Sequence, residues 1–424
     1  MKTIVLIGAG KSATVLIDYL IEEAEANKWK FIIADTNRQQ ILLKTNNSKF
    51  AEAVQLDITN EKQRGDLIQR AHVVISMMPP ALHFLVAKDC VEYRKHLLTA
   101  SYLDDKMTSL KDEISNRKLL FIAEMGLDPG IDHMSAMKIL DEIKSKGGKI
   151  TSFKSHCGGL VAPESDDNPW HYKISWNPRN IVMAGQSGAV YKENNEIIHI
   201  NYIDLFNSSN EIFFDGLEGL AFYPNRDSLG YISTYKLPDT ATFLRTTLRH
   251  VDFFKGWNAI VHAGLTNDTD VINAEGLSFK KWSSAILPLT NAENKKMLEY
   301  LGIFDDALVP SAAKTSADIL QHLIETKLKM EPADKDMIVM LHEFEYELDG
   351  KNKTLKSCLV VKGQDSLRTA MAKTVGLPLG IAAKLILNET IKLKGLHIPT
   401  VKEIYDPVLN ELETTGIKFA ETII

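Results

Sequence analysis

The chain has 424 residues, 45% hydrophobic and 25% charged, a composition typical of a globular protein with two or three domains. A formal net charge of −6 provides no broad basic face, so we expect no nucleic-acid partner. The three cysteines, Cys90, Cys157 and Cys358, are odd in number and widely spaced. This excludes a disulfide framework, gives no metal-ligand pattern and favours a reducing compartment.

The N-terminal apolar run, Ile4 to Ile7, is much shorter than the core of a signal peptide. No apolar stretch in the sequence approaches the roughly 20 residues of a membrane helix. We therefore expect a cytoplasmic protein with no membrane partner.

The first 125 residues alternate short apolar runs with helical patterns, which predicts a doubly wound parallel sheet of the Rossmann type. A helix is expected over Ser12–Glu25. Most of the runs are continuously apolar, as buried parallel strands require. The expected strands are Ile4–Ile7, Phe31–Ala34, Val54–Leu56, Val73–Ser76, Leu97–Ala100 and Leu119–Ala123.

The pattern changes after residue 126, and residues 126–364 are predicted to form an α+β domain for substrate binding and dimerisation. A helix is expected over Asp132–Lys146, ending at two glycines that suit a C-cap. Strands are expected at Ile150–His156 and Glu211–Phe214, and a helical segment near 285–330. Met337–Leu348 and Thr354–Val361 flank Asp349-Gly350 and predict a β-hairpin. Helical residues 365–424 are expected to complete the first domain.

A glycine loop follows the first predicted strand. Gly8, Gly10 and Ala13 have the G-x-G-x-x-G/A spacing, in which the glycines allow a tight turn and close approach of the backbone to a pyrophosphate. The anion would bind at the N-terminus of the next helix, where Lys11 and Ser12 could add contacts. The pattern predicts a bound nicotinamide dinucleotide.

Asp35 ends the second predicted strand, where the fingerprint places an acidic residue that binds the adenosine ribose. We therefore expect NAD(H) to be favoured, with Thr36 beside it, although Arg38 keeps NADP(H) possible. Further cofactor contacts are expected from Asp57, Ser76 and Pro79, which follow later strands. An ordinary loop is the alternative interpretation for these three.

Several blocks resemble the saccharopine reductase family, the glutamate-forming saccharopine dehydrogenases. Together with the glycine loop, they spread over nearly the whole chain. The blocks are Ala100–Tyr102, Glu124–His133, Ser155–Glu164, Asp167–Pro169, Lys173–Trp176, Leu244–Arg249 and Gly376–Ala382.

The resemblance implies hydride transfer to or from a carbon–nitrogen bond, interconverting saccharopine with glutamate and α-aminoadipate semialdehyde in lysine metabolism. It implies that Asp128, Cys157 and Tyr102 line the catalytic site, with Asp128 holding the amine or assisting proton transfer. It also implies residues that bind the substrate. We assign Arg245 to clamp a substrate carboxylate and Trp176 to wall the pocket, and we count Gly158 and Asn168 among the substrate-binding residues. A small-molecule amino-acid substrate and a homodimer are expected from the same resemblance.

Each of these residues also has a structural interpretation. Asp128 suits a turn before Pro-Gly, Cys157 and Trp176 suit a core, and Arg245 could face solvent. The chain departs from the family blocks at Val161, where the family has proline, at Thr246, where it has glycine, and at His250, where it has tyrosine. The altered neighbours leave substrate identity more open than reaction type.

Two other functions are compatible with the sequence. The first is a carboxynorspermidine-type enzyme, which would reduce the imine formed by a semialdehyde and a diamine. Binding a diamine requires acidic residues, whereas binding glutamate requires cations such as Arg245. A non-enzymatic dinucleotide-binding protein on the same fold is the second alternative.

Overall fold

The computed structural model describes residues 1–207 and 209–424, which divide into two compact units. Unit 1 contains Met1–Lys146 and Leu367–Lys418, and unit 2 contains Gly147–Ser366 and Phe419–Ile424. By contacts, unit 1 therefore extends past the expected boundary near residue 125 to residue 146. Helix α7 (Ile131–Ser145) belongs to unit 1, where Asp141 accepts a hydrogen bond of 2.7 Å from the Tyr405 hydroxyl of helix α15 (Lys402–Thr414).

Unit 1 contains a seven-stranded parallel sheet, counted over the described residues, in the order β16-β6-β5-β4-β1-β2-β3. Apart from the added β16, this is the 3-2-1-4-5-6 order of dinucleotide-binding folds. The predicted doubly wound parallel sheet is confirmed. The strands are β1 (Thr3–Ile7), β2 (Lys30–Asp35), β3 (Ala51–Gln55), β4 (Val73–Ser76), β5 (His96–Thr99), β6 (Leu120–Ile122) and β16 (Gly395–His397).

The helices of unit 1 cover this sheet because the strands are apolar on both faces, with β1, β4 and β6 buried throughout. A short 3-10 turn, η1 (Lys11–Ala13), precedes the first helix. The remaining helices of the unit are α1 (Thr14–Asn27), α2 (Arg38–Lys44), α3 (Glu61–Gln69), α4 (Pro80–Glu92), α5 (Asp105–Thr108), α6 (Lys111–Asn116) and α14 (Ala370–Leu387).

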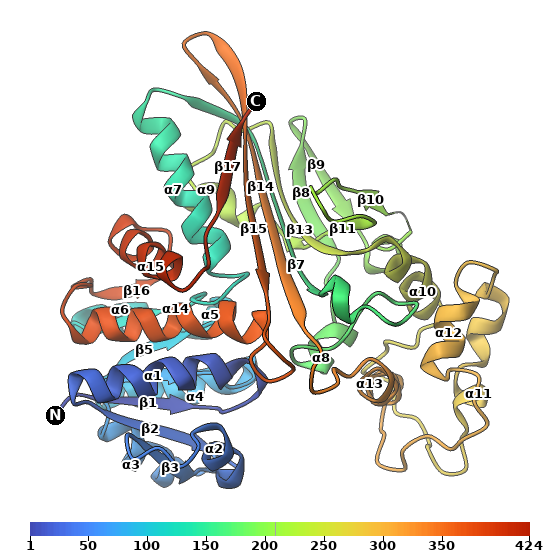
Figure 1. Ribbon diagram of the computed structural model, residues 1–424, viewed down its shortest axis with the longest axis horizontal. Helices are drawn as coiled ribbons and strands as arrows, with labels where there is room; N and C mark the ends of the chain where they lie inside the picture. The colour runs from blue at the N-terminus through green and yellow to red at the C-terminus, as the bar shows by residue number, and fades with distance from the viewer. Residues whose placement is uncertain (208) are drawn as a thin grey trace. The chain divides into compact units, whose positions relative to one another are not determined.

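Helix α14 lies alongside α1 and contacts β4 and β5 (Figure 1). Two glycines allow this close packing: a Cβ at Gly376 would lie 2.9 Å from the Leu16 Cβ, and one at Gly380 would lie 2.7 Å from the Tyr19 Cδ1. By length and composition α14 could also cross a membrane, which the sequence analysis did not anticipate. Its apolar window is 83% buried, as expected of a core helix.

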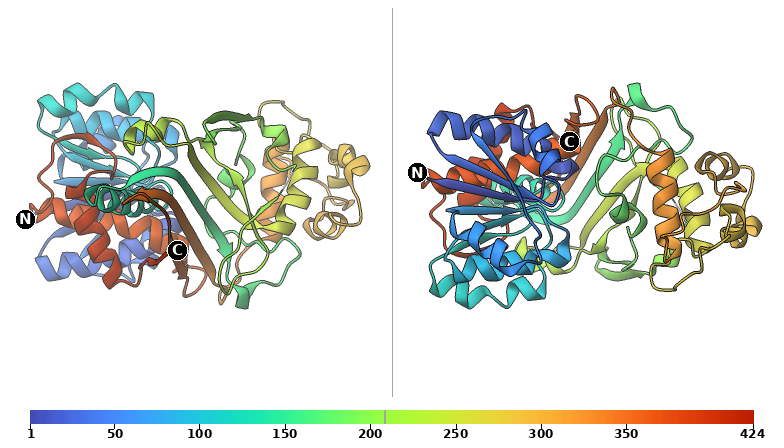
Figure 2. Two further views of the ribbon diagram at one scale, coloured as in Figure 1. Left: turned by 90° about the horizontal axis from the view of Figure 1, so that it is seen from above. Right: turned by 90° about the horizontal axis from the view of Figure 1, so that it is seen from below.

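Unit 2 is built on a ten-stranded mixed sheet, counted over the described residues, with the main order β10-β11-β13-β7-β14-β15-β17. Long strands β7, β14 and β15 curve together (Figure 2). The predicted hairpin is present, whereas the strand expected at Glu211–Phe214 is only two residues long. The strands are β7 (Lys149–Val161), β8 (Ala189–Glu193), β9 (Glu196–Ile200), β10 (Asn210–Glu211), β11 (Leu220–Pro224), β12 (Arg226–Asp227), β13 (Thr242–His250), β14 (Asp336–Leu348), β15 (Lys351–Lys362) and β17 (Ala420–Ile423).

A second core in unit 2 gathers large aromatic side chains, including Trp170, Tyr172 and Trp257, around the expected helical segment. Trp170 packs edge-on to Trp257 at a centroid separation of 6.3 Å. The helices and 3-10 turns are η2 (Pro163–Ser165), α8 (Pro178–Val182), η3 (Tyr202–Asp204), α9 (Gly230–Thr234), α10 (Val251–His262), α11 (Phe279–Trp282), η4 (Ser284–Leu289), α12 (Lys295–Leu301) and α13 (Ser316–Lys327).

Candidate functional site

The glycine loop joins β1 to η1 and α1, at the point in the sheet where the strand order reverses. Gly8 has φ +99°, and a Cβ there would lie 2.8 Å from the Met77 carbonyl oxygen, so only glycine fits. A Cβ at Gly10 would instead meet nothing within 4 Å. Ala13, the third position of the motif, is buried where a small residue is needed. The loop therefore has the close turn and the open approach that a pyrophosphate requires.

The first helical turns after this loop are suited to an anion. Neither Gly10 before η1 nor Ala13 before α1 supplies a side-chain cap among the described residues, so main-chain N–H groups remain suited to an anion. Lys11 and Ser12 lie in this turn, Lys11 exposed and Ser12 partly buried. Lys44, which the sequence analysis missed, donates to the Gly10 carbonyl oxygen at 2.5 Å. Burial lowers the pKa of Lys44 to about 8, although the charge of Asp35 opposes this.

Asp35 has a local structural role at the end of β2. Its Oδ2 accepts a hydrogen bond of 2.8 Å from the Ala9 N–H, and its Oδ1 accepts one of 3.0 Å from the Asn37 N–H. The Thr36 hydroxyl lies 3.2 Å from the same carboxylate. Asp35 thus holds the glycine loop in place, a role that does not depend on which cofactor binds.

The carboxyl ends of the strands carry Asp57, Ser76 and Pro79, as predicted, but the three side chains differ in their exposure to solvent. Asp57 is exposed, and hydrogen bonds from Thr59 lower the pKa of its carboxyl group. Pro79 is exposed and precedes the first turn of α4.

The Ser76 side chain is directed elsewhere than predicted. It is fully buried, with its hydroxyl 2.8 Å from His83 Nδ1, and His83 Nε2 lies 2.7 Å from the Ser101 hydroxyl. Burial lowers the pKa of His83 to about 4, so this imidazole is neutral at pH 7. The hydroxyl of Ser76 is therefore engaged in a buried hydrogen-bond network, and the predicted cofactor contact does not account for it.

Tyr102 and Asp128, which the resemblance assigns to the catalytic site, lie together in unit 1. The Tyr102 hydroxyl donates to Asp128 Oδ1 at 3.4 Å, and both side chains are partly buried. Nearby in sequence, His133 Nε2 lies 2.8 Å from Glu124 Oε2, with both side chains buried. The first pair combines a hydroxyl and a carboxylate that can exchange a proton with a bound amine.

Arg245 is buried in unit 2, contrary to its alternative interpretation as a solvent-facing residue. Its guanidinium carbon lies 4.5 Å from the centroid of the Tyr231 ring, and only 3% of the residue is exposed. The backbone of β13 is fixed there, because the Arg245 N–H donates to the Ser228 hydroxyl at 3.1 Å. A guanidinium stacked in this way is suited to bind a carboxylate.

Cys157 and Gly158 lie on β7 beside β13, where Cys157 is in register with Thr247 and is buried. A Cβ at Gly158 would lie 2.6 Å from the Leu248 Cβ. Gly158 is therefore explained by the close approach of two strands, and the predicted substrate contact is not needed to account for it.

Asn168 and Trp176 have structural roles, and for Trp176 this is the core packing that the sequence offered as its alternative interpretation. Asn168 donates to the Tyr172 carbonyl oxygen at 3.1 Å and accepts from the Trp170 N–H at 3.0 Å, which fixes the loop. Trp176 donates to the Tyr172 hydroxyl at 3.0 Å and packs against the aromatic core. Within unit 2, core packing thus accounts for the tryptophan predicted to wall the substrate pocket.

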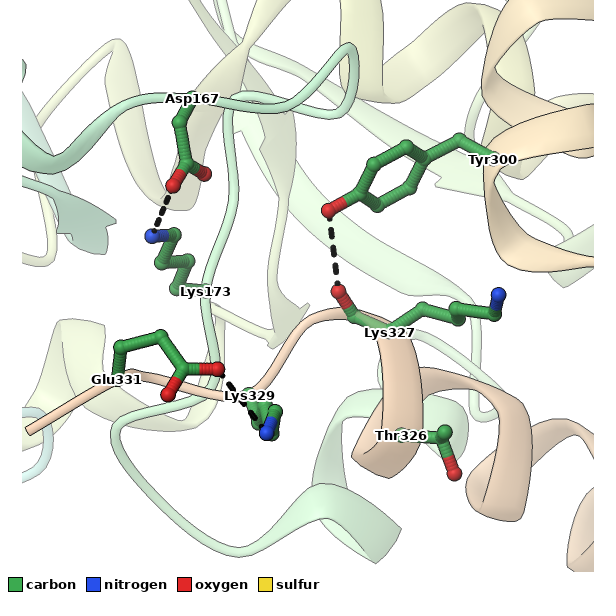
Figure 3. A pocket seen from close by; sticks show the side chains of 7 residues that line it. All are labelled: Asp167, Lys173, Tyr300, Thr326, Lys327, Lys329 and Glu331. Atoms are coloured by element: carbon green, nitrogen blue, oxygen red, sulfur yellow. Dashed lines mark hydrogen bonds and ion pairs between the residues drawn. The ribbon is translucent and has the colours of Figure 1, made fainter.

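A separate pocket of about 360 Å³ lies among loop residues and the end of α13 (Figure 3). Lys173 is directed to Asp167 at 2.8 Å and also pairs with Asp334 at 2.7 Å. Burial opposes its charge, but these two carboxylates outweigh burial and raise the pKa of Lys173. The predicted catalytic residues are not among those that line this pocket, which are Asp167, Lys173, Tyr300, Thr326, Lys327, Lys329 and Glu331.

The sheet order and the open glycine loop together define a dinucleotide-binding protein of the Rossmann class. The saccharopine dehydrogenase NADP binding domain matches residues 4–122, and the saccharopine dehydrogenase C-terminal domain matches residues 126–417. The chain belongs to the saccharopine dehydrogenase family, which confirms the resemblance seen in the sequence.

Named relatives agree with this assignment. Saccharopine dehydrogenase [NADP(+), L-glutamate-forming] of Saccharomyces cerevisiae is 33% identical over 97% of both chains. The apo structure of saccharopine dehydrogenase (L-Glu forming) from that yeast superposes with a TM-score of 0.90, at 30% identity and full coverage of both chains. Alpha-aminoadipic semialdehyde synthase of Arabidopsis thaliana is 35% identical over 87% of this chain, which spans only 38% of that longer protein.

The expected preference for NAD(H) is wrong. The matching family domain is an NADP binding domain, and the full-length fungal relatives are named as NADP(+) enzymes. The error came from reading Asp35 as a ribose ligand that repels a 2′-phosphate, whereas its carboxylate is bonded to the Ala9 and Asn37 N–H groups.

Proposed function

We propose that this protein interconverts saccharopine with glutamate and α-aminoadipate semialdehyde, using NADP(H). The observation that carries the proposal is the match in sequence and fold to the yeast L-glutamate-forming enzyme over the full length of both chains. In the direction of cleavage, the secondary amine would be oxidised to an imine by losing a hydride, which carries both electrons to NADP⁺, and a proton from nitrogen. Water then hydrolyses the imine to the amine of glutamate and an aldehyde.

The glycine loop fits the cofactor, which would supply the hydride chemistry. The open space beside Gly10 and the uncapped turn after it would receive the pyrophosphate. Arg38 begins α2 just beyond Asp35, and its Nε donates to the Ala53 carbonyl oxygen at 3.2 Å. We assign Arg38 to the 2′-phosphate, because guanidinium binds phosphate bidentately. The Arg38→Ala variant should raise KM for NADP⁺ with little change for NAD⁺.

On the substrate side, Asp128 and Tyr102 would hold the secondary amine and exchange its proton. Arg245 would bind a substrate carboxylate, and Cys157 would donate a hydrogen bond, since reduction of an imine needs no covalent nucleophile. Saccharopine carries several carboxylates, so a buried guanidinium favours it over a diamine-derived substrate. The homodimer and the cytoplasmic location remain expectations from the sequence.

The decisive experiment follows the absorbance of reduced nicotinamide with saccharopine and either NADP⁺ or NAD⁺, beside carboxynorspermidine as the alternative substrate. We expect turnover with saccharopine and NADP⁺. Turnover with carboxynorspermidine alone would identify the diamine-type enzyme, and cofactor binding without any turnover would support the non-enzymatic alternative.

A further inference from the structure

A cluster of metal-binding side chains lies in unit 2, outside the residues assigned to the reaction. His171, His250 and Asp252 each offer one ligand atom, and these atoms all lie within 4.8 Å of one another. His171 Nε2 is 3.5 Å from Asp252 Oδ2, and His250 Nδ1 is 3.8 Å from the same oxygen. The residues come from the loop after η2, the end of β13 and the first turn of α10. Their sequence spacing forms no metal motif, which explains why the sequence indicated none.

A second carboxylate orients the first imidazole. Asp166 Oδ2 lies 2.6 Å from His171 Nδ1, so the proton of this ring is held on Nδ1 and the lone pair of Nε2 is left for the cluster. Metal-ligating histidines are commonly held by a carboxylate in this way. Lys255 pairs with Oδ1 of Asp252 at 2.7 Å, leaving Oδ2 as the oxygen nearest the two rings.

The two imidazoles are placed face to face, with centroids 3.9 Å apart and planes inclined by 31°. The Asp252 N–H donates to His250 Nδ1 at 3.2 Å, a helix cap that a metal at this nitrogen would replace.

His171 has φ +47°, a left-handed backbone conformation that glycine adopts without strain. His250 stands where the family block Arg-Gly-Thr-Leu-Arg-Tyr has tyrosine, so one of the ligands departs from that block.

We propose that His171, His250 and Asp252 bind a divalent transition-metal ion of the zinc class, with Asp166 orienting His171. Tetrahedral ligands at zinc bond lengths are about 3.3 Å apart. The two distances to Asp252, 3.5 and 3.8 Å, need a small contraction, and the two imidazole nitrogens, which lie within 4.8 Å of each other, would also have to approach. Three protein ligands leave the fourth position to water. The ion would tie the loop before α8 to the start of α10.

The test uses the full chain without a polyhistidine tag, stripped of metal with a chelator. Co²⁺ is titrated while its visible absorption is recorded, and Zn²⁺ is then used to displace it. We expect one ion per chain, with the intense bands of low coordination. His171→Gly suits the positive φ, and His250→Tyr restores the family residue, so both variants should fold. Each should weaken binding about 100-fold, and Asp166→Asn about tenfold.

His199→Gln is the matched control, because His199 is an exposed histidine of β9 in the same unit. It should bind Co²⁺ as the unaltered chain does, and thermal denaturation checks that every variant is folded. The proposal is overturned if the chain binds no stoichiometric Co²⁺, or if binding persists in folded His171→Gly and His250→Tyr variants. Neither result depends on the dehydrogenase assay.

Discussion

Glycine has opposite roles in the glycine loop of unit 1 and in strand β7 of unit 2, which contains Gly158. At Gly10 the missing side chain leaves open space, whereas at Gly158 the space is filled by Leu248 from the next strand. Unit 1 therefore presents main-chain groups to a ligand, while unit 2 brings strands together and relies on buried side chains such as Arg245. A glycine leaves room for a ligand only where the position of its absent Cβ remains empty, as at Gly10, whereas at Gly8 and Gly158 it allows close packing.

The largest effect is expected at Gly8. Alanine there would combine a left-handed backbone with a 2.8 Å approach to the Met77 carbonyl oxygen. Gly8→Ala should lower the free energy of unfolding by about 2–5 kcal/mol and abolish cofactor binding. Gly10→Ala is the control, with stability within about 0.5 kcal/mol of the original but NADP(H) bound at least about tenfold more weakly. Denaturant unfolding and fluorescence titration measure both, and normal binding by Gly10→Ala would remove the loop from the cofactor site.

Acid should weaken unit 1 through His83. Its pKa is about 4 in the folded protein and about 6.5 in the unfolded chain, so the unfolded chain takes up the proton first as pH falls. The contribution of neutral His83 to the free energy of unfolding is fully present above pH 6.5, and it is smaller by about 3 kcal/mol at pH 4. Urea unfolding from pH 7 to pH 4 would measure it. The His83→Gln variant should lose less stability over this range than the original chain, and an equal loss would contradict the assignment.

Replacing Gly158 tests whether this glycine packs or binds. Gly158→Ala should lower the free energy of unfolding by about 2 kcal/mol, because the new methyl group overpacks against Leu248. KM for saccharopine should remain near its original value in the fraction that folds. A raised KM without loss of stability would instead give Gly158 the substrate contact predicted from the sequence.

The smallest effect is expected at Arg245. Arg245→Lys keeps the charge but loses the planar fork, so KM for saccharopine should rise about tenfold. Steady-state kinetics with saturating NADP⁺ would show this, with thermal denaturation as the check on folding. An unchanged KM would remove Arg245 from the substrate site.

The sequence predicted unit 1 well because its signals are local: buried strands form continuous apolar runs, and the glycine loop needs only six residues. By contacts, unit 1 extends beyond the expected boundary at 125, because helix α7, which follows Gly126 and Gly130, packs on α15. In unit 2, β7 continues through Gly158 and Gly159, which normally interrupt strands, because β14 pairs with both glycines and Leu248 of β13 packs against Gly158. The hydrogen bond from the Ala9 N–H to Asp35 spans 26 positions, so no local pattern could reveal that Asp35 supports the loop.

The position of α14 in the chain has a consequence for biosynthesis. The strands of unit 1 up to β6 leave the ribosome first, but α14, which covers β4 and β5, follows some 220 residues of unit 2. During translation, this apolar face stays exposed while unit 2 is synthesised, because α14 has not yet been made. Chaperones that bind exposed apolar surface should therefore engage the nascent chain most strongly before residue 387 has emerged.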